Sequence, residues 1–163
     1  MAKRNQSLVA LSHDHHHGLA LALRLKQGDK ALLNEGWTHD RREQANRVLR
    51  FYNQELRHHF YAEERALFPA MQKHMPEATS LIAPLLTEHR MMENLVASLE
   101  SAQHEQLELL LVELGDVLER HIRSEERELF ALYQSAVSDE LDAQIGREVS
   151  AAHDESLSRG RDV

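Results

Sequence analysis

Apolar residues recur every three or four positions along four long segments of the chain, and this spacing predicts four amphipathic helices. The first segment spans about residues 7–27, the second starts near Thr38, and the fourth spans about residues 105–134. Pro69 and Pro76 limit the far end of the second segment, and Pro76 is well placed to open the third helix, whose apolar stripe continues to Leu99. A shorter segment at about residues 139–157 predicts an accessory helix outside the others.

Long helices joined by short connections predict an all-α fold, namely an antiparallel four-helix bundle with a short extra C-terminal helix. One connection, at residues 29–38, is longer and contains Trp37, and the tail at 158–163 is expected to fray. A length of 163 residues fits one domain, 1–163, with a core of about 7–134 and the accessory helix at about 139–157.

Composition narrows the class of protein. Three prolines, six glycines and 5% aromatic residues are few for a β-rich protein. The absence of cysteine removes disulfides, thiolate catalysis and iron–sulfur ligation. A formal net charge of −8 argues against a nucleic-acid partner but leaves a protein partner or a homodimer open. Because no signal peptide or membrane span is recognisable, we expect no membrane association and a cytoplasmic location.

The chain contains twelve histidines, and several of them mark an internal repeat. Residues 56–68 read LRHHFYAEERALF, and residues 118–130 read LERHIRSEERELF. More weakly, residues 11–15 align with residues 85–89, and each of these segments ends on an acid followed by a histidine. The chain is therefore interpreted as two helical hairpins of similar design.

The repeat places two histidine–glutamate pairs at a spacing that suits metal binding. His59 and Glu63, like His121 and Glu125, are four residues apart, which puts both side chains on one helix face roughly 6 Å apart along the axis. Their neighbours on that face are apolar, and two buried carboxylates facing each other would repel unless cations neutralise them. The other two helices also carry one histidine each within the apolar stripe, His15 and His89.

Other histidines and glutamates lie close to these apolar stripes. His16 lies ~100° around the helix from His15 and is an alternative or additional ligand. Glu64 and Glu126 are expected to face solvent and pair with Arg65 and Arg127. The alternative is that they contact the metal-ligating side chains without touching the metal. His58 is expected at the rim or surface. The remaining histidines lie outside the repeated histidine–glutamate pattern and are expected at the surface. They are His13, His17, His39, His74, His104 and His153.

Imidazole and carboxylate ligands without thiolate suit iron, manganese or zinc. Two metals bridged by carboxylates within a helical bundle favour iron or manganese. The residues therefore predict a two-metal centre, with the identity of the metal left open.

The blocks HHFYAEERALFPAM, TEHRMMENL, HIRSEERELF and DHHHGLALALRL resemble the hemerythrin-like, or HHE cation-binding, domains over about residues 7–133. The resemblance implies an up-and-down bundle with an oxo- or hydroxo-bridged di-iron centre, for which manganese or zinc could substitute. The ligands carried over from the family, with Glu63 and Glu125 as bridges, are His15 (or His16), His59, Glu63, His89, His121 and Glu125.

Two departures bear on function. Oxygen-carrying hemerythrins have a further histidine one turn beyond the third-helix ligand, where this chain has Glu93, and they have a fourth-helix aspartate in place of the His121–Glu125 arrangement. We therefore expect a protein that binds, senses or processes a small oxidant such as dioxygen, nitric oxide or peroxide, and not a simple oxygen carrier. The alternatives are a metal-free or pH-responsive helical interaction module and an iron-handling or iron–sulfur-repair protein, although the cysteine-containing segment of the repair proteins is absent.

Overall fold

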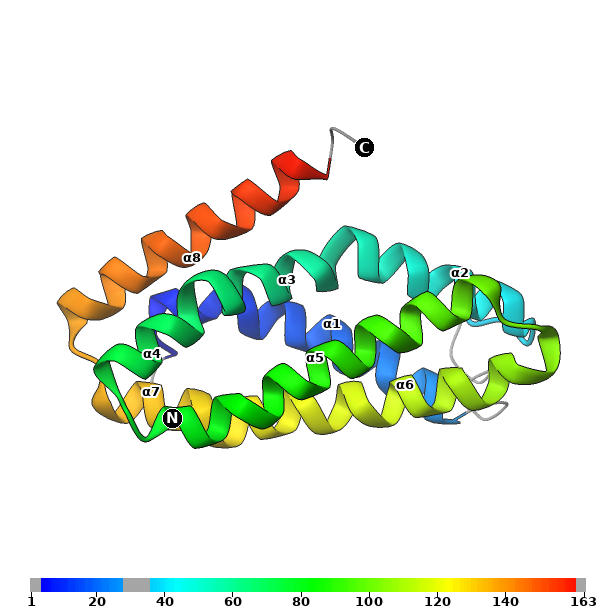
Figure 1. The fold of residues 1–163 in the computed structure, drawn as a ribbon, viewed down its shortest axis with the longest axis horizontal. Helices are drawn as coiled ribbons and strands as arrows, with labels where there is room; N and C mark the ends of the chain where they lie inside the picture. The colour runs from blue at the N-terminus through cyan, green and yellow to red at the C-terminus, as the bar shows by residue number, and fades with distance from the viewer. Residues whose placement is uncertain (1–3, 28–35, 161–163) are drawn as a thin grey trace.

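The computed structural model describes residues 4–27 and 36–160 of the chain, and their regular structure is entirely helical (Figure 1). Three helices are single segments: α1 (Gln6–Gln27), α5 (Ala78–Ser101) and α8 (Asp139–Arg159). The second long helix consists of α2 (Arg41–Phe51), η2 (Tyr52–Leu56), α3 (Arg57–Ala62), η3 (Glu63–Leu67) and α4 (Phe68–His74). The fourth consists of α6 (His104–Ser124), η4 (Glu125–Leu129) and α7 (Phe130–Ala136).

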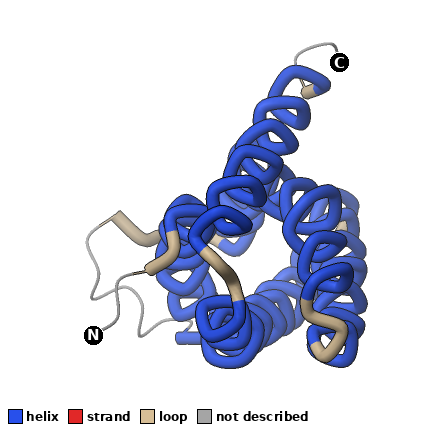
Figure 2. The backbone as a smooth tube through the Cα atoms, turned by 90° about the vertical axis from the view of Figure 1, so that its left-hand side faces the viewer, coloured by secondary structure: helices blue, strands red, loops and turns tan. Residues whose placement is uncertain are grey.

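Four long helices surround a common core, and α8 packs outside them, mainly on α1, α3 and η3 (Figure 2). This arrangement confirms the predicted all-α bundle with an extra C-terminal helix. The buried apolar residues form two clusters, one containing Leu8, Phe68 and Tyr133 and the other containing Ala22 and Leu114. Because the helices are antiparallel, these clusters fill opposite ends of the bundle. None of the helices in the described ranges is long and apolar enough to cross a membrane.

Helix boundaries differ from the predicted ones by a few residues. The second long helix begins at Arg41 and not near Thr38, because the Asp40 carboxylate caps it by accepting hydrogen bonds from the Arg42 and Glu43 backbone N–H groups. The third begins at Ala78, two residues after Pro76. The predicted end of the first helix at 28–29, most of the 29–38 connection and residues 161–163 lie outside the described residues. The tail was expected to fray from residue 158, but α8 continues to Arg159.

Both copies of the repeat contain a π-helical turn at the same place. The turn η3 begins at Glu63, and η4 begins at the equivalent Glu125. Pro69 follows η3, but its counterpart after η4 is Ala131, so proline is not required for the widened turn. Such turns are rare and are frequent at functional sites. Their residues keep the apolar spacing of an ordinary α-helix, so the sequence does not predict them.

The accessory helix α8 is fixed to the bundle by a buried polar network. The Asp142 carboxylate accepts hydrogen bonds from the Ser7 hydroxyl, from the Tyr133 hydroxyl at 3.0 Å and from the Gln6 backbone N–H at 3.2 Å. Burial alone would raise the pKa of Asp142, but these donors outweigh burial and lower it, because they stabilise the ionised carboxylate. The network therefore joins α8 to both α1 and α7.

The close approach of α1 and α6 depends on Gly115. A Cβ atom there would lie 3.0 Å from the Ala22 carbonyl oxygen and 3.1 Å from the Leu25 Cβ. We expect Gly115→Ala to lower the free energy of unfolding by about 1–2 kcal/mol, because this crowding outweighs the better helix propensity of alanine. Urea unfolding measures the change. Gly146→Ala in α8 is the control, since its new Cβ would come no closer than 3.4 Å to Ser7; equal stability of the two variants would contradict the packing argument.

Candidate metal centre

Six side chains converge in the space between the two apolar clusters, and each is at most 4% exposed. Every long helix of the bundle contributes at least one of them. They are His15 from α1, His59 and Glu63 from α3 and η3, His89 from α5, and His121 and Glu125 from α6 and η4.

The donor atoms form two overlapping groups of metal-binding geometry, one of His15, His59, Glu63 and Glu125, and the other of Glu63, His89 and His121. In each group, two histidine Nε2 atoms face each other, at 3.1 Å between His15 and His59 and 3.3 Å between His89 and His121. The two groups share Glu63, so this residue lies between two positions that could each hold a metal ion.

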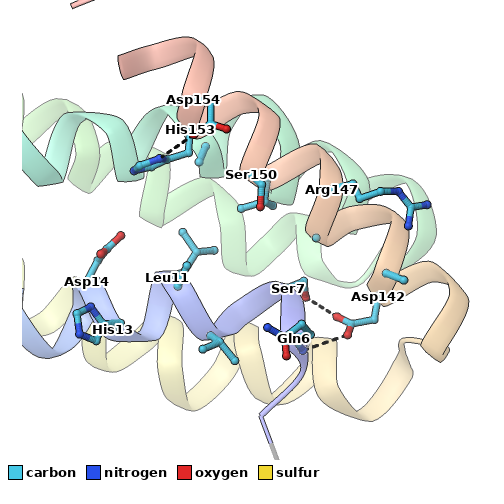
Figure 3. A pocket seen from close by; sticks show the side chains of 16 residues that line it. Gln6, Ser7, Leu11, His13, Asp14, Asp142, Arg147, Ser150, His153 and Asp154 are labelled. Carbon is cyan, nitrogen blue, oxygen red and sulfur yellow. Dashed lines mark hydrogen bonds and ion pairs between the residues drawn. The ribbon is translucent and has the colours of Figure 1, made fainter. Parts of the chain in front are cut away.

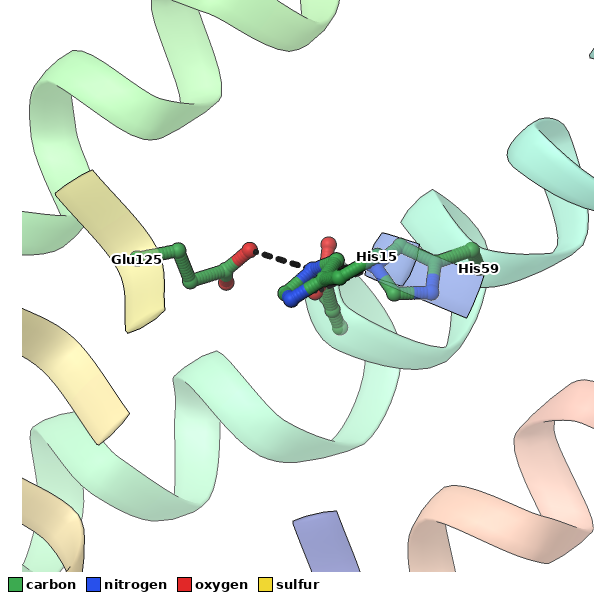
Figure 4. A group of neighbouring side chains, drawn as sticks. His15, His59 and Glu125 are labelled. Carbon is green, nitrogen blue, oxygen red and sulfur yellow. Dashed lines mark hydrogen bonds and ion pairs between the residues drawn. The ribbon is translucent and has the colours of Figure 1, made fainter. Parts of the chain in front are cut away.

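The two glutamates reach the groups differently. Glu63 directs one oxygen to each side, with Oε1 2.8 Å from His59 Nε2 and Oε2 3.3 Å from His89 Nε2. Glu125 uses a single oxygen, Oε2, which lies 3.1 Å from His15 Nε2 and 3.6 Å from His121 Nε2. Figure 4 shows Glu125 directed at His15, with His59 beside it. Glu63 is therefore better placed than Glu125 to bridge both positions.

Behind the histidines lies a closed ring of four more carboxylates, which we call the outer carboxylates. Each accepts a hydrogen bond from the Nδ1 atom of a histidine on the next long helix. The pairs are Asp14–His59 at 3.0 Å, Glu64–His89 at 2.8 Å, Glu88–His121 at 3.2 Å and Glu126–His15 at 2.8 Å. Each long helix therefore supplies a carboxylate that accepts a hydrogen bond from a histidine of the following long helix. The fourth helix closes the ring by bonding to the first. Such bonds fix both the tautomer and the orientation of a ligating imidazole.

The ring of outer carboxylates explains why the centre suits a cation. An ionised carboxylate only accepts hydrogen bonds, so each Nδ1 atom donates, and a neutral imidazole then presents a bare Nε2 lone pair to the centre. Both oxygens of Glu63 and of Glu125 are buried, and they make no hydrogen bond within the described part of the chain. Four lone pairs and two carboxylates without a donor among them are costly in a buried site unless metal ions bind them. The donor set therefore fits a pair of metal ions.

Without a metal, protons would have to supply the missing positive charge. Burial alone would lower the pKa of His59, but the Glu63 and Asp14 carboxylates outweigh burial and raise it to about 10. The pKa of His89 is raised to about 9, because Glu63 and Glu64 likewise outweigh the effect of burial. Burial would raise the pKa of Glu63, but the adjacent His59 and His89 rings lower it overall.

Three histidines near the centre differ in their burial and contacts. His16 is exposed on α1 and belongs to neither donor group, whereas His15 belongs to one. The predicted surface position of His58 was wrong: it is buried, and its Nδ1 atom lies 2.8 Å from the Ser156 hydroxyl oxygen of α8. The sequence does not reveal this burial because α8 lies far away along the chain.

Glu64 and Glu126 are not paired with Arg65 and Arg127 in the described structure. They accept hydrogen bonds from the Nδ1 atoms of the candidate ligands His89 and His15, which matches the alternative prediction. Their arginine partners are Arg90 and Arg4. The roles of Asp14 and Glu88 were missed. The signal was present, because both acids directly precede a candidate histidine in the weaker repeat.

A buried set of imidazoles and carboxylates contributed by all four helices places the chain among the helical metal-binding bundles. A family model, the hemerythrin HHE cation binding domain, matches residues 7–133, and the chain belongs to this family. Comparisons with curated proteins and with solved structures found no match. Together, the family and the two donor groups indicate a metal-binding site of the kind that holds iron.

Proposed function

We propose that the chain is a non-haem di-iron protein that binds, senses or processes a small oxidant. The observation that carries the proposal is the pair of donor groups sharing Glu63, whose buried carboxylate oxygens face only imidazole Nε2 atoms among the described residues. Six residues would hold the ions: His15, His59, Glu63, His89, His121 and Glu125. Both glutamates are candidate bridges, and Glu63, which belongs to both donor groups, is the better placed of the two. When bound, the iron pair would supply the redox chemistry that a small oxidant requires.

The residues around the centre support this role. The outer carboxylates hold the imidazole rings with their Nε2 atoms inward, so the ligands are oriented before a metal arrives. The Phe60 ring stacks on His89 with the ring centres 3.8 Å apart, and it approaches His121 edge-on at 5.9 Å. An apolar ring against two ligand histidines excludes water from that side and strengthens the electrostatic interactions within the centre.

A small cavity beside the centre supports a small ligand. It has a volume of about 10 Å³ and is lined by His15, His59 and His121, with apolar walls that include Phe60 and Ile122. A space of this size holds about one water molecule. A dioxygen, nitric oxide or peroxide molecule is of comparable size, whereas a larger organic substrate would require the helices to separate.

We also propose that residues 1–163 form a single domain, with a core at about 7–134 and an accessory helix at about 139–157. In support, α8 places Ile145, Val149 and Ala152 in the same apolar cluster as residues of the long helices. It is also joined to α1 and α7 through Asp142.

Metal analysis and absorption spectroscopy test the proposed function. Protein produced in iron-replete medium is expected to contain about two iron ions per chain, as in other di-iron bundles. Its near-ultraviolet absorption should change when anaerobic, reduced protein meets dioxygen, nitric oxide or peroxide. Protein that takes up zinc or manganese in preference to iron, or whose spectrum ignores all three oxidants, would contradict the proposal.

A further inference from the structure

A groove of about 930 Å³ lies between α1 and α8, on the side of the bundle where α8 packs (Figure 3). Among the described residues that line it, Asp14 and Asp154 present carboxylates and Arg147 presents a guanidinium. Asp142 also lines the groove, but its carboxylate is buried and already accepts three hydrogen bonds. A concave surface with an excess of negative charge raises the local concentration of cations. The groove is therefore a favourable surface on which a metal ion could first be held.

Asp14 connects this groove to the centre. Among the described residues, it alone lines both the groove and the small cavity beside the ligand histidines. Its side chain is 29% exposed, and its Oδ2 atom lies 3.0 Å from the Nδ1 atom of His59, whose side chain is 2% exposed. A single carboxylate thus separates solvent in the groove from the ligand His59.

Asp14 also differs from the other three outer carboxylates in its surroundings. Each of those three is paired with an arginine that balances its charge and holds it: Glu64 with Arg90, Glu88 with Arg120, and Glu126 with Arg4. Within residues 4–27 and 36–160, Asp14 forms no ion pair with an arginine or a lysine. Its recorded ionic partner there is His59, on the inner side, so the carboxylate meets the groove without an arginine or a lysine bound to it.

We propose that Asp14 is a positioning residue that also conducts a divalent metal ion from the groove to the His15–His59 side of the centre. At rest, its carboxylate accepts the hydrogen bond of His59 Nδ1. During uptake, the same carboxylate offers the first anionic oxygen on the path. The inference rests on the proposed metal-binding function, but it concerns the rate of uptake and not the amount of metal bound at equilibrium.

The pseudo-symmetry of the bundle supplies a matched control. Asp14 in α1 and Glu88 in α5 occupy equivalent positions before His15 and His89, and each orients a histidine of the following long helix. Asp14→Asn and Glu88→Gln therefore weaken equivalent hydrogen bonds, but only the first removes charge from the groove. Asp14→Glu keeps the charge and reports whether the position tolerates substitution.

The experiment mixes metal-free protein with ferrous iron under anaerobic conditions and follows uptake by competition with a chromophoric chelator. We expect Asp14→Asn to slow uptake on the order of 10-fold and to reduce its dependence on ionic strength, as for a lost steering charge. Glu88→Gln loses an equivalent orienting hydrogen bond, so it should lower the affinity for iron about as much as Asp14→Asn does, but it should keep the wild-type dependence of the uptake rate on ionic strength. Asp14→Glu, which keeps the charge, should keep that dependence as well.

Two results would overturn the inference. Equal slowing in Asp14→Asn and Glu88→Gln would mean that the outer carboxylates only orient histidines. A wild-type rate in Asp14→Asn, with normal iron at equilibrium, would mean that metal reaches the centre elsewhere. Failure of the wild-type protein to bind iron at equilibrium is a separate result, and it would overturn the proposed function itself.

Discussion

Replacing Glu63 by Gln should leave the protein without stably bound metal, whereas replacing Glu125 by Gln should leave about one metal ion per chain. The difference follows from the geometry of the two carboxylates. Glu63 has an oxygen within 3.3 Å of a histidine Nε2 atom on each side, and it belongs to both donor groups. Glu125 belongs only to the group of His15 and His59.

Without Glu63, each position would keep mainly imidazole ligands, and a neutral amide is a far weaker ligand than a carboxylate for a doubly charged ion. Without Glu125, the group of Glu63, His89 and His121 stays intact. The measurement is the metal content per chain after reconstitution with ferrous iron and removal of the excess. Glu128→Gln is the matched control, because Glu128 lies in the same turn η4 but is exposed and bonded to Ser124.

Circular dichroism separates loss of metal from loss of fold, since a folded Glu63→Gln protein keeps its helical signal. If Glu63→Gln retained one ion while Glu125→Gln lost both, the assignment of Glu63 as the better bridge would be wrong. If both variants retained two ions, neither glutamate would be a ligand. The wild-type value of about two, expected for such bundles, is the reference for each comparison.

The inward side of the centre could be foreseen from the sequence. The histidine and glutamate of each repeat interrupt an apolar stripe at helical spacing, so a periodic pattern alone places them in the core. The sequence favoured His15, which keeps the register of the stripe, but left His16 open as an alternative or additional ligand. The structure buries His15 and exposes His16.

The outward side could not be foreseen to the same extent. Glu64 and Glu126 look like surface residues because each lies one position away from a buried glutamate. Their partners, His89 and His15, lie on other helices, so the hydrogen bonds depend on how the helices pack and not on local spacing. The burial of His58 has the same origin, because α8, more than 80 residues further along, covers it.

Metal binding and protonation should compete, so the affinity for iron should rise with pH. In the metal-free protein, the pKa of His59 is raised to about 10 and that of His89 to about 9, so both rings hold a proton on Nε2 at neutral pH. A metal ion needs that lone pair and must release the proton. Between pH 6 and 8, the logarithm of the apparent binding constant should therefore increase by roughly one unit per pH unit for each proton displaced.

Stability without metal should change in the opposite direction. A histidine whose folded-state pKa is raised contributes stability that is fully present below its unfolded pKa of about 6.5 and is lost as the pH rises through the folded value. Metal-free protein should therefore lose stability between about pH 6.5 and pH 10, the window set by His59 and His89. The increase in thermal midpoint caused by iron should grow over the same range.

Chelator competition measures the affinity, and anaerobic melting of metal-free and iron-loaded protein measures the stability. An affinity that does not depend on pH between 6 and 8 would show that no protons are exchanged for metal.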